Sequence, residues 1–492
     1  MPASIPFDNS YARLPARFHA RLAPTPVAGP RLIKLNRALA EELRLDSAWL
    51  GSPDGLAMLA GNAVAEGSEP LAAAYAGHQF GNFVPQLGDG RAMLLGEVID
   101  KHGRRRDIQL KGSGPTPFSR MGDGRAALGP VLREYLVSEA MAALGIPTTR
   151  ALAAVATGEP VIRETVLPGA IVTRVAASHI RVGTFQYFAT RGDTEAVRAL
   201  ADHVIARHDP ELEGREDRYR ALIAAVSARQ AELVARWLLV GFVHGVMNTD
   251  NMSVAGETID YGPCAFLDAY DARTTFSSID RHGRYAYGQQ PRIALWNLTR
   301  FAETLLPLLP EDEDAGVKEA EAALATFGPC FDAAYRGGLA RKLGLAELRE
   351  GDAELAGDLL RVMAENQADH TLTFRRLCAA AETSDADGLV RDGFVDPTAY
   401  DAWSVRWRSR LAEDPRDPAE RASAMRAVNP AFIPRNHRIE EMIEAAMERD
   451  DFAPFETLLA VLSRPYDDQP EHARYAEAPE GGGVGYRTFC GT

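Results

Sequence analysis

Apolar positions fall into short runs in the first 190 residues and recur at helical spacing beyond them. The runs at 92–99 and 107–110, joined by a polar turn, predict a β-hairpin that ends at Lys111. Three further β-like runs are separated by Gly and Pro, at 151–156, 161–166 and 170–175. The pattern therefore predicts a small antiparallel sheet followed by a larger helical region.

Helical spacing of apolar residues is clearest in three segments. At 31–45, leucines and isoleucines recur near a 3.6-residue period, which predicts an amphipathic helix within an N-terminal extension. A second helix is predicted at 130–144, with its proline in the first turn, where proline is tolerated. A long helix at 218–243 runs directly into H-G-V-M-N-T-D-N at 244–251. Two short strand-like segments are expected between that string and D-Y-G-P at 260–263.

Composition narrows the class of protein. Of the 492 residues, 46% are hydrophobic and 25% are charged, which suits a globular protein with buried cores and argues against disorder. The formal net charge of -14 opposes binding to nucleic acid and to anionic membranes. The N-terminal string MPASIPFDNS has neither a basic nor an apolar leader region, so we expect neither secretion nor membrane spanning. The four cysteines form no C-x-x-C pair, which argues against structural zinc and a disulfide scaffold.

The string at 244–251 and the D-Y-G after it carry the strongest chemical signal. An Asp-Asn pair, followed after a short hairpin by a second Asp, is how kinase-like enzymes hold a base and divalent metal ions. Asp250 would then accept the proton of the attacking hydroxyl, and Asn251 and Asp260 would supply oxygen ligands for Mg²⁺ or Mn²⁺. A plain Asn/Asp turn is the alternative. The expected kinase Asp is replaced by Val246, which puts ordinary phosphoryl transfer in doubt.

Lys111 is one of only five lysines and ends a predicted strand. The kinase lysine that contacts nucleotide phosphates and pairs with a helix glutamate has the same setting. The predicted helix offers Glu134 and Glu139, which lie about 140° apart around its axis, so only one of them faces the lysine. We favour Glu134, while a solvated lysine at a strand end is the alternative.

Gly-Asp-Gly-Arg occurs twice, at 88–91 and 122–125, on either side of the predicted hairpin. Such glycines are first of all turn formers, but they also let backbone amides approach phosphate or ribose, and Arg91 adds charge-assisted hydrogen bonds. Arg174 and Arg181 flank the junction between the β-rich and helical parts, where a nucleotide cleft would lie. Two guanidinium groups there could clamp a phosphate, although most arginines are simply surface residues.

Several longer strings are similar to those of one family. They are YAGHQFGNFVPQLGDGRA, QLKGSGPTPFSRMGDGRAAL, HGVMNTDNMS, IDYGP, NPAFIPRNHRIEEMIEAA and the terminal CGT. The chain resembles the selenoprotein O family, also known as the YdiU family of bacteria, over essentially its whole length.

The resemblance implies an α+β, bilobal, protein-kinase-like fold of the pseudokinase type. A small β-rich N-lobe with one key helix would face a larger helical C-lobe, with an N-terminal extension and extra C-terminal helices. The expected parts are an N-terminal extension at 1–70, a nucleotide-binding N-lobe at 71–185, a C-lobe with the catalytic loop and metal site at 186–300, a helical region at 301–465 and a flexible tail at 466–492.

The resemblance also implies transfer of AMP from ATP to Ser, Thr or Tyr hydroxyls of proteins, with the nucleotide flipped so that its α-phosphate meets the acceptor. By motif, ATP would be bound by Gly88, Gly90, Arg91, Lys111, Asp123, Gly124, Arg174, Arg181 and Asp260. Asn251 and Asp260 would hold Mg²⁺ or Mn²⁺, and Asp250 would be the proton acceptor. We expect a monomer in the bacterial cytoplasm, without nucleic-acid or membrane partners.

Two other functions stay open: a conventional kinase of proteins or small molecules, and an inactive scaffold that binds nucleotide. Eukaryotic relatives place selenocysteine near the C-terminus, where this chain has Cys490. The resemblance implies, for some members, a redox bridge from that tail to the segment after Asp260, which here contains Cys264. A Cys264–Cys490 disulfide and a free thiol are both left open.

Overall fold

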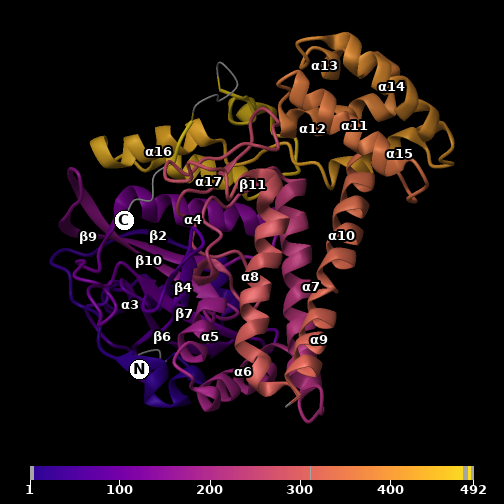
Figure 1. Cartoon of the computed structure of the whole chain (residues 1–492). Coiled ribbons are helices and arrows are strands. Elements are labelled where there is room, and N and C mark those ends of the chain that lie inside the picture. Colours follow the sequence, from indigo (N-terminus) through magenta and orange to yellow (C-terminus); the bar gives the residue numbers. More distant parts are fainter. Residues whose placement is uncertain (1–4, 311, 480–485, 489–492) are drawn as a thin grey trace.

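The computed structural model of the chain describes residues 5–310, 312–479 and 486–488. It is a mixed α/β structure in which one antiparallel sheet lies beside a larger assembly of helices (Figure 1). No helix in the described ranges is both long and apolar enough to cross a bilayer.

Within the described residues, the main sheet has eight strands, all paired antiparallel. In spatial order they are β1 (His19–Arg21), β3 (Leu71–Ala73), β6 (Ala92–Ile99), β7 (Arg105–Lys111), β10 (Val166–Ala176), β9 (Arg150–Ile162) and β2 (Arg31–Leu35), and β8 (Ala126–Ala127) pairs with β10. Lys111 stands opposite Ala92 on one side and Val172 on the other. The register therefore fixes the Lys111 backbone between two neighbouring strands.

The predicted hairpin is confirmed by β6 and β7. Its turn is stabilised by Asp100, whose carboxylate accepts the backbone N–H groups of His102 and Arg104 at 2.8 and 2.9 Å. The strand predicted at 161–166 is wrong, because that run contains the turn between β9 and β10. β9 continues through Pro160. On the side of β2 it is paired only as far as Ala156, so beyond that residue this edge of β9 is open. Proline is tolerated on such an edge because no ladder hydrogen bond is needed from its nitrogen.

The helix predicted at 31–45 is also wrong. Residues Arg31–Leu35 form β2 at one edge of the sheet, and the short helix α1 (Arg37–Glu42) follows. Asn36 separates the two because its side-chain oxygen accepts the N–H of Leu39 at 3.1 Å and caps α1. Pairing with β9 outweighs the local periodicity, since strand conformation depends on its neighbours. With β1 at the opposite edge, the expected N-terminal extension supplies both edges of the sheet.

Helix α4 (Leu128–Ala143) corresponds to the helix predicted at 130–144 and packs against β9 and β10. Its other side is covered by α16 (Asn436–Arg449) and α17 (Ala453–Leu462), the yellow helices above it in Figure 1. Glu134, on the side of α4 that faces β7 and β10, is only 4% exposed.

Two short helices, α2 (Ser47–Leu50) and α3 (Pro53–Leu59), lie beside the sheet. The remaining helices form the other part of the molecule: α5 (Val182–Ala189), α6 (Thr194–His208), α7 (Arg218–Leu239), α8 (Gln290–Leu305), α9 (Glu313–Leu324) and α10 (Phe327–Lys342). They are followed by the orange group of Figure 1, which consists of α11 (Asp352–Glu365), α12 (His370–Glu382), α13 (Asp387–Arg391), α14 (Pro397–Ala412) and α15 (Pro418–Arg426).

The long predicted helix ends earlier than expected, at Leu239. Gly241 adopts a φ of 76°, which terminates a helix readily because glycine has no Cβ. The next residues form β11 (Phe242–Val243), which pairs with β12 (Ala265–Phe266). The segment 244–264 is therefore held at both ends by one pair of strands.

The two strand-like segments expected within this loop are wrong. Ser253 and Thr258 form only isolated bridges, to Arg181 and Thr148 respectively. These bridges nevertheless attach the loop to the β-rich part of the chain.

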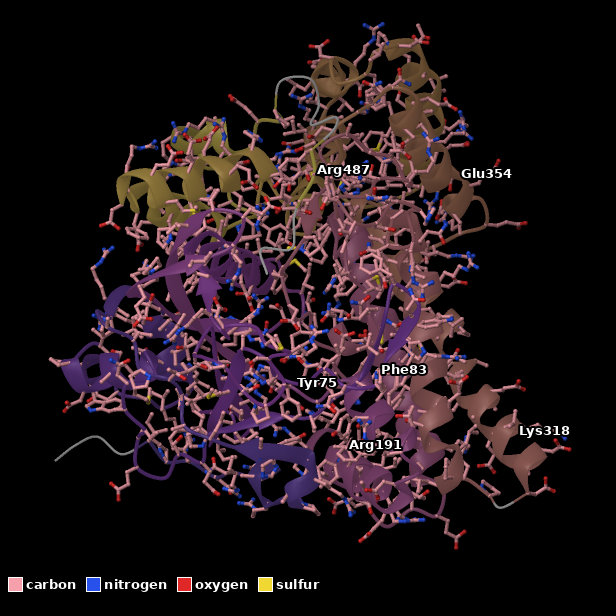
Figure 2. The ribbon with its side chains drawn as sticks, turned by 60° about the vertical axis from the view of Figure 1, so that its left-hand side comes forward. Tyr75, Phe83, Arg191, Lys318, Glu354 and Arg487 are labelled. Atoms are coloured by element: carbon pink, nitrogen blue, oxygen red, sulfur yellow. The ribbon has the colours of Figure 1, made fainter. Side chains whose placement is uncertain are left out.

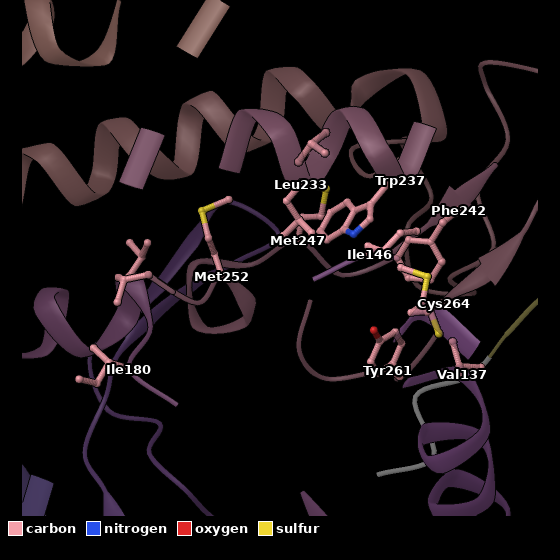
Figure 3. Packing of buried hydrophobic residues seen from close by; sticks show 14 of the residues in the cluster. Val137, Ile146, Ile180, Leu233, Trp237, Phe242, Met247, Met252, Tyr261 and Cys264 are labelled. Atoms are coloured by element: carbon pink, nitrogen blue, oxygen red, sulfur yellow. The ribbon is translucent and has the colours of Figure 1, made fainter. Parts of the chain in front are cut away.

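One apolar core extends from the sheet into the helices. Figure 3 shows Val137 of α4, Trp237 of α7 and Tyr261 of the loop gathered around Phe242. The Phe242 ring lies 5.6 Å from that of Trp237 and 6.1 Å from that of Tyr261 between centroids. Burying each such side chain contributes about 1.5–3 kcal/mol, so the loop that carries Asp260 is firmly held.

Candidate nucleotide-binding site

A cavity of about 910 Å³ opens between β6, β7, β10, α4 and the loop 244–264. Every site residue expected from the sequence lines it: Gly88, Gly90, Arg91, Lys111, Asp123, Gly124, Glu134, Arg174, Arg181, Asp250, Asn251 and Asp260. Residues that are up to 172 positions apart in the chain thus meet in one cleft of the size that ligand pockets usually have.

Asp260 is the centre of this cleft because three cationic side chains converge on its carboxylate. Arg174 and Lys111 donate to Oδ1 at 2.6 and 3.2 Å, and Arg181 donates to Oδ2 at 2.7 Å. Burial acts to raise the pKa of Asp260, but the three nearby charges outweigh it and hold the pKa well below its usual range. The backbone of Asp260 has a φ of 62°, a left-handed conformation that is uncommon outside glycine.

Glu134 completes the charge cluster from the other side. It accepts from Lys111 at 2.6 Å and from Arg174 at 3.2 Å. Burial acts to raise the pKa of Glu134, but the Lys111 and Arg174 charges lower it overall. Glu139 points elsewhere and binds Arg150 at 2.7 Å.

Arg174 is oriented by the sheet itself. It stands opposite Gln109 in the register of β10 and β7, and Gln109 Oε1 accepts from the Arg174 Nε at 3.0 Å. Gln109 is fully buried, so the guanidinium is fixed before any ligand arrives.

Arg181, directly before α5, connects the β-rich part to the loop. Its Nη1 also donates to the backbone carbonyl of Asp250 at 2.7 Å, and its guanidinium lies 4.6 Å from the ring centroid of Tyr75. Asp89 approaches it at 3.8 Å. Tyr75, labelled in Figure 2, is half-buried, and its ring face is placed to attract the Arg181 guanidinium. Neither Tyr75 nor Asp89 was expected from the sequence.

Asp250 lies in a one-turn 3-10 helix, Thr249–Asn251, and is 6% exposed. Its Oδ2 accepts from Gln79 Nε2 at 3.2 Å, while its buried Oδ1 has no hydrogen-bond partner among the described residues. Burial raises the pKa of Asp250 to about 6, although the Gln79 bond and the Arg181 charge act to lower it. An unpartnered carboxylate oxygen with a raised pKa is suited to accept a proton.

A short hairpin, β4 (Gly77–Gln79) and β5 (Asn82–Val84), contacts the loop 244–264 and holds it in place. The backbone N–H of His78 donates to Thr249 Oγ1 at 2.7 Å, and that of Phe80 donates to Asn248 Oδ1 at 3.1 Å. Gly77 lies so close that a Cβ there would stand 2.3 Å from Asp250 Oδ1. The sequence marks this stretch as rich in Gly, Asn and Gln but indicates no role for it.

The two Gly-Asp-Gly-Arg turns lie along the same cavity. Gly88 has a φ of 83°, and a Cβ there would stand 2.4 Å from the Phe118 ring, so only glycine fits. Asp123 is paired with Arg163 at 2.8 Å at the surface, and this hydrogen bond lowers its pKa.

The described residues contain no group of three or more His, Cys, Asp or Glu side chains placed to bind a metal. Two residues with oxygen donors line the cleft, Asp260 with its carboxylate and Asn251 with its side-chain amide. The Asn251 Nδ2 donates a hydrogen bond to the backbone carbonyl of Val246 at 3.0 Å, which orients the amide group. Asp250, whose Oδ1 has no hydrogen-bond partner among the described residues, lines the same cavity. This donor set fits a hard cation such as Mg²⁺, which usually takes one or two carboxylates and fills its other positions with phosphate and water.

Comparison with known proteins identifies the family of the chain. A sequence model of the family described as Protein adenylyltransferase SelO matches residues 3–463. The chain belongs to the SelO family. It is 73% identical to a protein of Methylorubrum populi and 72% identical to one of Methylorubrum extorquens, in each case over 498 aligned residues and all of both chains. A protein of a Bradyrhizobium species is 67% identical over 492 residues, again across both chains.

All three relatives are named protein nucleotidyltransferase YdiU. Membership of the SelO family makes this chain an enzyme of the nucleotidyltransferase class.

The C-terminal segment of this SelO family member contacts the loop after Asp260. Thr488 Oγ1 donates to Pro263 O at 2.7 Å, and the Thr488 N–H donates to Phe276 O at 2.7 Å. Cys264 is buried, and burial raises the pKa of its thiol to about 12. Cys490 lies outside the described residues, so the disulfide stays a prediction.

Proposed function

We propose that this enzyme transfers AMP from ATP to a hydroxyl of Ser, Thr or Tyr in another protein. One observation carries the proposal: Lys111, Arg174 and Arg181 converge in a cavity that Asp250 also lines, and the Oδ1 of Asp250 has no hydrogen-bond partner among the described residues. A triphosphate needs the cations, and an attacking hydroxyl needs the base.

In the proposed reaction the acceptor oxygen attacks the α-phosphorus of ATP. A new oxygen–phosphorus bond forms, the bond to the bridging oxygen breaks, and pyrophosphate leaves with the bonding electron pair. Asp250 takes the hydroxyl proton on Oδ1. Lys111, Arg174 and Arg181 release the Asp260 carboxylate and bind the β- and γ-phosphates. Their positive charge then balances the negative charge that pyrophosphate gains as it leaves.

Asn251 and Asp260 would hold Mg²⁺ or Mn²⁺. When bound, such an ion neutralises phosphate charge and orients the triphosphate. Gly88, Gly90, Arg91, Asp123 and Gly124 are proposed to contact the nucleotide along the same cavity.

We also infer a kinase-like division of the chain. The sheet with α4 would act as the N-lobe, roughly 71–185, and the segment 186–300 as the C-lobe with the catalytic loop. The Lys111–Glu134 pair between strand and helix supports this view, as does the loop carrying Asp250 and Asn251. We further propose that the enzyme works as a monomer in the cytoplasm.

Two labelled forms of ATP test the reaction. Transfer of label from [α-³²P]ATP to protein, with none from [γ-³²P]ATP, is expected. Label from the γ position alone would make the enzyme a conventional kinase, and label from neither, with ATP still bound, would make it an inactive scaffold.

A further inference from the structure

A second cavity, of about 510 Å³, lies beside the nucleotide cleft, and its lining is cationic. Arg273, Arg281 and Arg487 line it together with the hydroxyl residues Thr275 and Ser278. All three arginines are exposed, and Figure 2 shows Arg487 near the C-terminal segment. The chain as a whole carries a net charge of -14, so this basic hollow is a local departure from the rest of the surface.

The basic hollow keeps an excess of positive charge, because one carboxylate among its lining residues faces three guanidinium groups. That carboxylate, Asp280, is held by the neutral backbone N–H groups of Arg284 and Tyr285 at 2.9 and 2.8 Å. Arg273 pairs with Asp271 at 3.0 Å, yet its side chain is 91% exposed, and such pairs exchange partners at little energetic cost. No carboxylate of the described residues lies within 4.0 Å of Arg281.

Arg487 is held ready for an anion. Its Nη1 donates to the carbonyl and hydroxyl oxygens of Thr275 at 3.1 and 2.8 Å. These bonds fix the guanidinium and leave its other N–H groups for a ligand. The planar guanidinium group matches the geometry of a carboxylate.

The basic hollow and the nucleotide cleft share one stretch of backbone. Ile279, 57% exposed, lines the cleft, whereas its neighbours Ser278 and Asp280 line the hollow. Consecutive Cα atoms are about 3.8 Å apart, so a polypeptide that presents a hydroxyl in the cleft would pass over the hollow within a few residues. Ile162, 74% exposed at the end of β9, also lines the cleft, and the fully exposed Met121 lies between the lining residues Arg120 and Gly122.

We propose that the basic hollow is a docking subsite for an Asp or Glu side chain of the acceptor polypeptide, close in sequence to the modified hydroxyl. The proposal rests on the proposed function and names a substrate class for it: acceptor segments with an acidic residue beside the target and an apolar residue against Ile279. The charge of the hollow selects the acidic side chain, and the exposed rim receives the apolar one.

Synthetic peptides test the docking subsite. Each peptide has one Tyr, Ser or Thr in a neutral frame, with a single Asp or a single Lys placed at each neighbouring position in turn. With [α-³²P]ATP, the wild-type enzyme is expected to label the Asp peptides at least about tenfold more than the Lys peptides at one or two positions on one side of the hydroxyl. Arg281→Glu and the double variant Arg273→Glu/Arg281→Glu are expected to lose or invert this preference. Arg336→Glu, at an exposed position of α10, is the matched control and is expected to keep it.

Binding is measured separately by fluorescence anisotropy of the same peptides, so the result does not depend on turnover. Equal binding and labelling of Asp and Lys peptides by the wild type, or an Asp preference that survives Arg281→Glu, overturns the docking subsite. If the wild type ignores peptide charge but binds inorganic phosphate in an Arg281-dependent way, the hollow serves a free anion instead. Absence of α-label from every peptide, with binding preference intact, counts against the proposed function and leaves the docking subsite standing.

Discussion

Replacement of Gly77 by alanine tests the catalytic loop most directly. The added Cβ would stand 2.3 Å from Asp250 Oδ1, 2.8 Å from its Cγ and 2.9 Å from its Cβ. The Gly77 backbone is not in the left-handed region, so the substitution introduces crowding without backbone strain. The collision therefore acts on the proposed base and on little else.

The size of the effect follows from these distances. An ordinary contact begins at about 3.4 Å, so the Asp250 carboxylate must move by about 1 Å or the hairpin must lift by a similar amount. A displacement of that size at a reacting group lowers the rate by about 100-fold, or about 2.7 kcal/mol of activation free energy. Overpacking of this kind destabilises a protein by about 1–3 kcal/mol.

The assay is AMP transfer from [α-³²P]ATP, measured together with ATP binding by thermal shift. Gly77→Ala is expected to lose about 100-fold in rate while it keeps ATP affinity within about twofold, since Lys111, Arg174 and Arg181 are not touched. Gly357→Ala is the control, because a Cβ at that position in α11 meets nothing within 4 Å. A Gly77→Ala enzyme with the wild-type rate would show that the position of Asp250 does not limit the reaction.

Three further substitutions have defined outcomes. Lys342 is buried, and burial lowers the pKa of its ammonium group from 10.5 to about 7. Between these two pH values the unfolded chain binds one proton more than the folded chain. The free energy of unfolding of the wild type should therefore rise by about 1.4 kcal/mol per pH unit in that range. In urea unfolding, Lys342→Met should lack this pH dependence and have a higher free energy of unfolding than the wild type at pH 7. A variant with the same pH dependence as the wild type would contradict the prediction. Glu134→Gln should lower the free energy of unfolding by about 3 kcal/mol and weaken ATP binding, because Lys111 and Arg174 lose a buried partner; an unaltered melting temperature would count against this. Asp260→Asn should sharply lower AMP transfer and raise the Mg²⁺ or Mn²⁺ concentration needed for half-maximal rate, and a metal dependence unchanged from the wild type would argue against Asp260 as a ligand.

Much of the sheet and its key helix could be predicted from the sequence because their signals are local. The apolar run at 92–99 and a proline in the first turn of α4 depend on neighbouring residues only. The segment 31–45 failed because its strand is decided by pairing with β9, more than a hundred residues away. The run at 161–166 failed because its polar middle, residues 163–165, forms the turn but contains no Gly, Pro, Asn or Asp to mark one.

The candidate site divides in the same way. Asp250, Asn251 and Asp260 were identifiable because their spacing within one loop carries chemical meaning. Gln79 was not, since its bond to Asp250 joins residues 171 positions apart. Tyr75 was missed for a similar reason, because an aromatic ring beside a guanidinium becomes visible only when Arg181 is brought to it.

The carboxylates around the cleft have a consequence for how ATP arrives. Asp260 and Glu134 carry two negative charges against the three positive charges of the side chains they touch, so they cancel much of the field that these cations would project into solvent. Nucleotide capture is then an exchange of counter-ions at short range rather than long-range steering. The association rate should consequently vary little with ionic strength, and small anions in the cell should seldom occupy the cleft.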